Sequence, residues 1–248
     1  MTTLDTSGVL TFASFAFPPN LLGYCGPDDT GLLADHLDEA AVGELGRLAQ
    51  QFDGAWPYLC LIGRHNGLDP LDRRVVEGYW LGGPAAARVP VSAMGDHVSE
   101  RFRRRSGWRG IAASTADQGG LPTHAHHVLN VYPWVGLARA GMANPGLDII
   151  DRCRIRQGRV LAVEEGRIRV RTDRLRLVGE FLARERDTED LVTPTPLVGS
   201  IEPGMRVAIH WDWICAILSD DQAARRAGAE RRALAQANRG ARSPGIWG

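Results

Sequence analysis

The sequence predicts an α+β protein in which a mostly helical first part is followed by a small antiparallel β-barrel and a closing helix. Two observations carry this prediction. Up to about residue 147, apolar residues recur at three- and four-residue steps, which is typical of amphipathic helices. After the turn signal Asn144-Pro145-Gly146 they alternate instead, as in half-buried strands. We therefore expect a helical domain over 1–147, a barrel with its helix over 148–238 and a flexible tail over 239–248.

The first part offers several helix start signals. The sequence Asp-Asp-Thr at 28–30 can cap a helix whose apolar residues recur between 33 and 52. Pro70 can open a second helix. Ser92 can cap a third, which ends in arginines, the charge that a helix C-terminus favours.

The second part reads as strands. Residues 159–163 and 167–171 are strand-like, and the turn pair Glu165-Gly166 between them makes a hairpin plausible. Ser219 can then cap a closing helix over 220–238. Further strands are expected at 174–182, 197–200 and 206–211.

Composition excludes several classes of protein. The net charge is zero, so no basic excess points to nucleic acid, and every cation is arginine, so no lysine exists to form a Schiff base. No apolar run approaches the roughly 18 residues of a membrane span, and the first residues lack a signal-peptide pattern. The four cysteines are scattered without a CxxC pair, which is typical of reduced thiols. We expect a cytoplasmic protein whose partners include neither membrane nor nucleic acid.

A cysteine and a histidine mark the two ends of the strand-rich part. Cys153 stands at the start of the first strand pattern and is followed at set intervals by Gly158 and Val160. His210 ends a later strand pattern that begins after Gly204. A thiolate with an imidazole forms either a transition-metal pair or a reactive-cysteine pair.

With this spacing, residues 148–233 resemble the HypC/HupF/HybG family of [NiFe]-hydrogenase maturation chaperones. The shared pattern is Cys, four residues, Gly and a Val-rich strand, and later Gly, an apolar strand, His, an aromatic segment and an acidic helix start. The resemblance implies an OB-like barrel in which Cys153 and His210 bind iron that carries cyanide and carbon monoxide. It also implies a partner, which is the hydrogenase large-subunit precursor or another maturation factor.

The chain departs from the chaperone pattern in three places. Cys153 follows a long N-terminal part instead of standing near a chain terminus, Gln157 replaces a proline, and Trp211-Asp212 replace a glycine. Without a mobile terminus, another element should control access to the Cys/His pair. The candidate is the Pro- and Gly-rich loop 18–29, in which Cys25 could add a soft metal ligand.

The segment His124-Ala125-His126-His127 is a second candidate site. Three histidines in four residues can ligate zinc, nickel or iron, sense pH or cap a helix. On a helix His124 and His127 share a face, whereas on a strand His124 and His126 would share one. Aspartates are expected to orient the rings of such a site. The candidates are Asp28, Asp29 and Asp96.

Three functions stay open at this point. The leading one is a non-enzymatic iron carrier or assembly protein for a [NiFe]-hydrogenase, with Cys153 and His210 as ligands and the helical domain docking the partner. The alternative is a metalloenzyme, with zinc or nickel as well as iron as candidate metals. Its site would use the three histidines and Cys25, and no catalytic residue is assigned. The third is a binding module whose barrel keeps its fold without metal.

Overall fold

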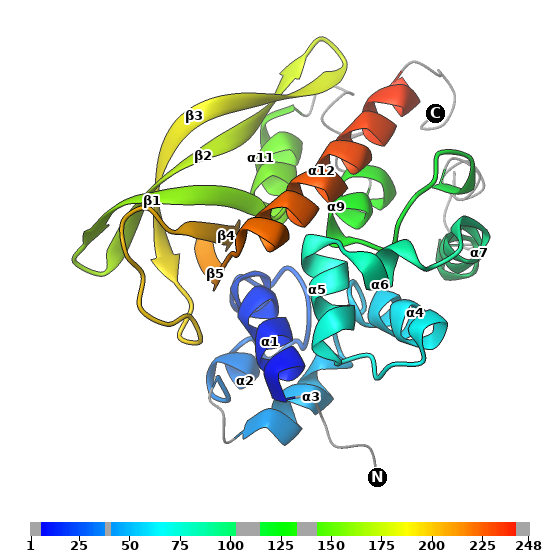
Figure 1. Cartoon of the computed structure of the whole chain (residues 1–248), viewed down its shortest axis with the longest axis horizontal. Helices are drawn as coiled ribbons and strands as arrows, with labels where there is room; N and C mark the ends of the chain where they lie inside the picture. The colour runs from blue at the N-terminus through cyan, green and yellow to red at the C-terminus, as the bar shows by residue number, and fades with distance from the viewer. Residues whose placement is uncertain (1–5, 38–40, 103–114, 133–142, 242–248) are drawn as a thin grey trace.

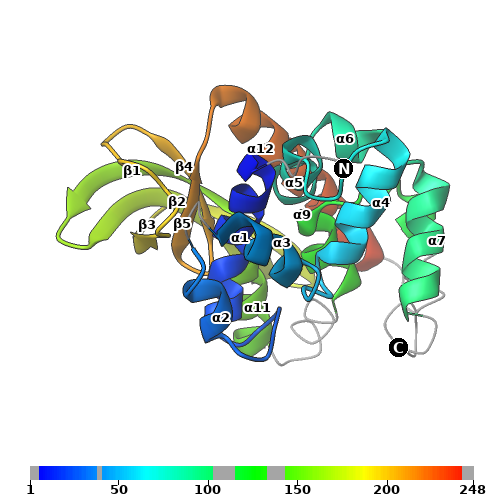
Figure 2. The same ribbon diagram turned by 90° about the horizontal axis from the view of Figure 1, so that it is seen from below.

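The structure is a computed structural model of the whole chain, and it describes residues 6–37, 41–102, 115–132 and 143–241 (Figure 1). Helices gather on one side of the molecule and strands on the other (Figures 1 and 2). The chain is thus an α+β protein, as the sequence predicted. Within the described ranges, no helix has the length and apolar character needed to cross a bilayer.

A series of helices precedes the sheet within the described residues up to 132. Asp72 begins one of them by accepting a hydrogen bond from the Arg74 backbone N–H at 2.9 Å, and Gly67 ends another in the left-handed region at φ 65°. The helices are α1 (Thr6–Leu21), α2 (Gly31–Ala34), α3 (Val42–Ala49), α4 (Trp56–Asn66), α5 (Arg73–Leu81), α6 (Pro84–Ala87), α7 (Val91–Phe102), α9 (His124–His126) and the π-helix η2 (His127–Val131).

Two helical expectations were wrong. The Pro-rich segment expected to start a loop at residue 18 is helical, because Pro18 and Pro19 lie inside α1 and the loop begins only after Leu21. Helix α1 is apolar on every side and buried, so it shows no amphipathic spacing in the sequence. The single helix expected between 33 and 52 is two separate helices, α2 and α3.

The sheet has five strands in the order β1-β2-β3-β5-β4, and β1 pairs with both β2 and β4, so the order returns to its start. Four pairings are antiparallel, but β3 and β5 pair in parallel. The expectation of a purely antiparallel sheet was therefore wrong, since a ring of five strands cannot alternate in direction all the way round. The strands are β1 (Arg156–Glu164), β2 (Arg167–Val178), β3 (Phe181–Pro194), β4 (Arg206–His210) and β5 (Trp213–Ile217).

Two strand expectations were also wrong. Residues 174–182 do not form one strand, because they span the end of β2, a turn and the start of β3. Residues 197–200 lie in the irregular connection between β3 and β4. The expected hairpin at Glu165-Gly166 joins β1 to β2, with Gly166 in the left-handed region at φ 71°.

Helix α11 (Ala143–Cys153) runs across the position expected to separate two domains. The expected turn at Asn144-Pro145-Gly146 lies in its first turn, where a proline loses no intrahelical hydrogen bond. Cys153 is consequently the last residue of a helix and not the first of a strand. The main apolar core contains residues of α1 to α7 together with Ile155, Ala208 and Cys215, so helices and strands share it.

Helix α12 (Asp220–Ala241) closes the structure and contacts β3, α5 and α9. It begins with a reciprocal cap, in which the Gln222 N–H donates to Ser219 Oγ at 3.2 Å and the Ser219 N–H donates to Gln222 Oε1 at 2.9 Å. This start was predicted. The helix runs on to Ala241, into the expected tail, of which residues 242–248 lie outside the described chain.

A buried group of charges anchors the link between α11 and β1. The Arg154 guanidinium is 1% exposed and pairs with Asp151 at 2.8 Å, with Asp173 at 2.7 Å and with Glu230 of α12. Burial acts to lower the pKa of Arg154, but the three carboxylates outweigh it and hold that pKa above its ordinary value. The network fixes the backbone next to Cys153.

Candidate metal centre

Three potential metal ligands meet where the helices adjoin the sheet. One ligand atom each from His124 in α9, Cys153 in α11 and His210 in β4 lies within 4.8 Å of the other two. His124 Nε2 lies 3.9 Å from Cys153 Sγ, and the two imidazole rings are 5.1 Å apart. The structure therefore joins the expected Cys153/His210 pair to one of the expected histidines.

An unusual turn holds His210 beside Cys153. Trp211 and Asp212, between β4 and β5, have φ of 52° and 66°, in the left-handed region that favours glycine. Contacts to α11 hold the turn, since the Trp211 N–H donates to the Arg152 carbonyl at 2.8 Å and Arg152 pairs with Asp212 at 2.8 Å. The Tyr24 ring also stacks on Trp211 at 4.1 Å. These contacts make bulky residues acceptable where the chaperone pattern has glycine.

The histidine segment is helical, so His124 and His127 share a face, as expected for a helix. Nδ1 of each ring lies 3.3 Å from Tyr79 Oη. His127 begins the π-helix η2, a form that often accompanies functional sites. Tyr79 lies in the amphipathic helix α5, and nothing in the sequence separates it from the other aromatic residues of the core.

His126 lies outside the cluster formed by His124, Cys153 and His210. Its Nδ1 lies 3.1 Å from Gln236 Oε1 of α12, and its Nε2 lies 3.4 Å from Thr115 Oγ1. Burial lowers the pKa of His126 to about 4, against a weaker opposing effect of the Gln236 hydrogen bond. This histidine therefore joins α9 to α12 as a neutral ring.

A main-chain carbonyl orients His210, where the sequence predicted an aspartate. The His210 Nδ1–H donates to the Phe15 carbonyl at 2.7 Å, which leaves the lone pair on Nε2. His210 is 1% exposed, and among the described residues its Nε2 has no hydrogen-bond partner. His124 Nε2 lies 2.8 Å from the Cys153 carbonyl. Asp29 instead accepts from the Gly31 N–H at 3.0 Å.

Burial sets the charge of the three ligands. It lowers the pKa of His124 to about 4, and it lowers that of His210 well below the ordinary value, with His124 adding to the effect. Both rings are thus neutral at pH 7, the form that binds metals. Burial also raises the pKa of the Cys153 thiol. A bound cation would reverse that effect, because a coordinating thiol is deprotonated.

The cluster borders a cavity of about 120 Å³. Cys25 and His127 lie in its wall but outside the group of three ligand atoms. Tyr24 and Cys25 come from the loop after α1, so part of the segment 18–29, which was expected to control access, lines the same cavity as Cys153 and His210. The remaining lining residues are Pro19, Phe52, Gly54, Ala55, Tyr79, Trp80, Tyr132, Ile149 and Trp211.

Comparison with known proteins identifies a family without identifying an activity. Searches of curated proteins and of solved structures each found no match. A model of a protein family, described as a family of unknown function, DUF6390, matches residues 4–243. The match spans the helices, the sheet and α12, so it includes all three ligands of the cluster. The chain therefore belongs to DUF6390, a family of unknown function.

Proposed function

We propose that this chain binds one transition-metal ion, with iron as the leading candidate, through His124, Cys153 and His210. The observation that carries the proposal is His210, a buried ring whose Nδ1 is fixed by a carbonyl and whose Nε2 has no hydrogen-bond partner among the described residues. A buried polar atom without a partner costs about 1–3 kcal/mol. Coordination of a metal by this atom would remove that cost.

The ligand types narrow the choice of metal. One thiolate and two neutral imidazoles suit iron, zinc or nickel, whereas magnesium and calcium prefer oxygen ligands. The three ligand atoms already lie within 4.8 Å of one another, and to bind the ion His124 Nε2 must release the Cys153 carbonyl, which lies 2.8 Å away. Three protein ligands also leave a coordination position open.

We further propose that the bound metal is cargo in [NiFe]-hydrogenase maturation. The support is the chaperone-like spacing around Cys153 and His210, the two residues that the resemblance assigns to iron. The order of five strands is also compatible with an OB-like barrel. The partner would then be the hydrogenase large-subunit precursor or another maturation factor, and the chain would act as a carrier.

Metal analysis of protein purified without oxygen tests the proposal. We expect close to one iron per chain, with infrared bands of cyanide and carbonyl ligands. Cys153→Ser and His210→Gln should lose the metal, whereas Cys60→Ser, a half-exposed thiol of α4 outside the cavity, should keep it. A wild-type chain that is folded but takes up no transition metal would exclude a metal function.

A second candidate function is that of a metalloenzyme. It is favoured by the cavity beside the ligands, whose wall carries His127 and Tyr79. Catalytic zinc sites commonly have three protein ligands and one open position next to such a cavity. Zinc without cyanide or carbonyl bands would support this function over that of an iron carrier.

A further inference from the structure

We propose that the cavity beside the three ligands binds a small monovalent anion, such as azide or hydroxide, between the metal and His127. This inference rests on the proposed metal site, and it places the anion in the coordination position that the three protein ligands leave open. Three independent features support it: the charge of the site, the state of His127 and the size of the cavity.

The charge of the site calls for an anion. A divalent metal bound only by one thiolate and two neutral imidazoles keeps a net charge of +1, which one cyanide of the proposed iron complex or another monovalent anion would balance. Among the described residues that line the cavity there is no carboxylate to balance this charge. Because an unbalanced buried charge is costly, the open position favours a ligand with a single negative charge. The Cys25 thiolate is the rival, but its sulfur lies outside the group of three ligand atoms.

His127 offers a hydrogen-bonding atom to such an anion. The ring is 1% exposed and lines the cavity, and its Nε2 has no hydrogen-bond partner among the described residues. Stacking on Tyr132 at 4.3 Å and contact with Tyr58 at 4.9 Å hold the ring in place. A fixed and unpaired polar atom beside three metal ligands is the arrangement expected for a ligand-binding group.

Tyr79 connects His127 to the metal site. With a metal on His124 Nε2, the proton of that ring is on Nδ1 and is donated to Tyr79 Oη, which lies 3.3 Å away. The Tyr79 hydroxyl has two acceptors at 3.3 Å, the Gly54 carbonyl and His127 Nδ1, and donation to His127 Nδ1 places the His127 proton on Nε2. Each of the three side chains keeps the number of protons it had. The result is an N–H group at the cavity wall.

The size of the cavity limits the anion to a few atoms. A volume of about 120 Å³ exceeds what one water molecule needs and accommodates an ion with a small ligand. Gly54 helps to keep this space open, since a Cβ there would lie 3.1 Å from Tyr132 Oη and 3.6 Å from His127 Cε1.

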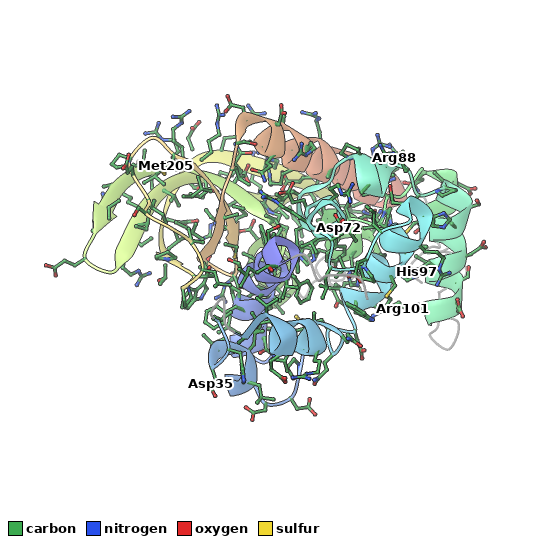
Figure 3. The ribbon with its side chains drawn as sticks, turned by 60° about the horizontal axis from the view of Figure 1, so that its bottom comes forward. Asp35, Asp72, Arg88, His97, Arg101 and Met205 are labelled. Atoms are coloured by element: carbon green, nitrogen blue, oxygen red, sulfur yellow. The ribbon has the colours of Figure 1, made fainter. Side chains whose placement is uncertain are left out.

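A second cavity provides an entrance. Its volume is about 520 Å³, and it shares Tyr24, Cys25, Gly54, His127 and Tyr132 with the first. Arg101 also lines it, close to His97 along α7 (Figure 3). Asp53 lines this cavity as well, so the entrance carries one charge of each sign.

Azide titration of cobalt-loaded protein tests the inference, because azide changes the visible bands of cobalt when it binds. Wild type should take up one cobalt and bind azide. His127→Phe should keep cobalt but bind azide about tenfold to a hundredfold more weakly, since a hydrogen bond to a charged group is lost. His126→Gln, a change on the same helix but outside the cavity, should bind azide like wild type. If His127→Phe does not fold, His127→Leu, which also lacks a hydrogen-bond donor, replaces it.

Three outcomes would overturn the inference. Unchanged azide affinity in a cobalt-loaded His127 variant would exclude a role for this ring. A wild-type spectrum with two thiolate ligands, reduced to one in Cys25→Ser, would show that Cys25 occupies the open position. Either result leaves the metal site standing. A wild-type protein that takes up no cobalt would overturn the inference and the proposed function together.

Discussion

Acid should unfold the metal-free protein steeply, because four buried histidines must be neutral in the fold. Burial is the main cause in all four cases: the pKa values of His124 and His126 are lowered to about 4, and those of His127 and His210 well below the ordinary 6.5. In the unfolded chain each pKa returns to about 6.5. Unfolding therefore takes up protons below pH 6.5. The stability that is fully present above that value is lost as the pH falls toward 4.

The magnitude follows from the number of protons. Each proton taken up on unfolding lowers the unfolding free energy by about 1.4 kcal/mol per pH unit. These four histidines give about 5 to 6 kcal/mol per unit between roughly pH 5.5 and 4.5, which approaches the whole stability of a typical domain. His97 adds up to about 1.4 kcal/mol per unit, because burial lowers its pKa to about 4 as well. Carboxylates whose pKa values are lowered by arginine partners contribute only below their ordinary values of 3.8 and 4.5.

Urea unfolding at half-unit steps from pH 7 to 4.5, after removal of metal with a chelator, measures this slope. His126→Gln should reduce the slope by about 1.4 kcal/mol per pH unit, because one proton fewer is taken up. A wild-type slope near 1.4 kcal/mol per unit, or an unchanged slope in His126→Gln, would refute this account.

Two further predictions concern the thiols and the buried arginine. Cys153→Ser should weaken cobalt binding by more than tenfold, and Cys25→Ser by much less, because only the Cys153 sulfur lies within the ligand group. Competition with a colorimetric chelator measures both affinities. Equal losses would contradict the assignment of Cys153 as the thiolate ligand. Arg154→Met should lower the unfolding free energy by about 3–5 kcal/mol, because the carboxylates that pair with Arg154 stay buried without their cation. Arg159→Met, at an exposed position, should change the unfolding free energy by less than about 0.5 kcal/mol. Urea unfolding at pH 7 compares the two arginine variants. Similar losses of unfolding free energy would show that the buried ion pairs of Arg154 add no net stability.

The sequence predicted elements whose signals are local. The helix start at Ser219 was found because a cap and its acidic first turn are neighbours in sequence, and the β1–β2 hairpin because Glu165-Gly166 separates two strand patterns. Helix α1 was missed, since a helix buried on all sides has no polar face to reveal its period. The parallel β3–β5 pair depends on closure of the sheet, which no local pattern encodes.

At the candidate site, too, the sequence revealed the residues with local signals and missed those that only the packing brings together. Cys153 and His210 stood out by residue type and spacing, and His124 by the run of histidines. The groups that orient them did not, because one is the main-chain carbonyl of Phe15 and another is Tyr79, an ordinary aromatic residue of a core helix. The expected aspartates were chosen by chemical type alone. Only the packing of α1 and α5 against the site decides which atoms reach the rings.

The bond from His210 to the Phe15 carbonyl joins residues 195 positions apart in the chain. During synthesis, α1 leaves the ribosome long before β4, which carries the ring that this carbonyl orients. The other two ligands are also separated from His210 by most of the sheet. If these three residues bind a metal as proposed, a nascent chain has no complete site until β4 has left the ribosome, and at about 5–20 residues per second that delay lasts many seconds. Metal insertion must then follow translation, and a truncated chain that ends before β4 should not retain the ion.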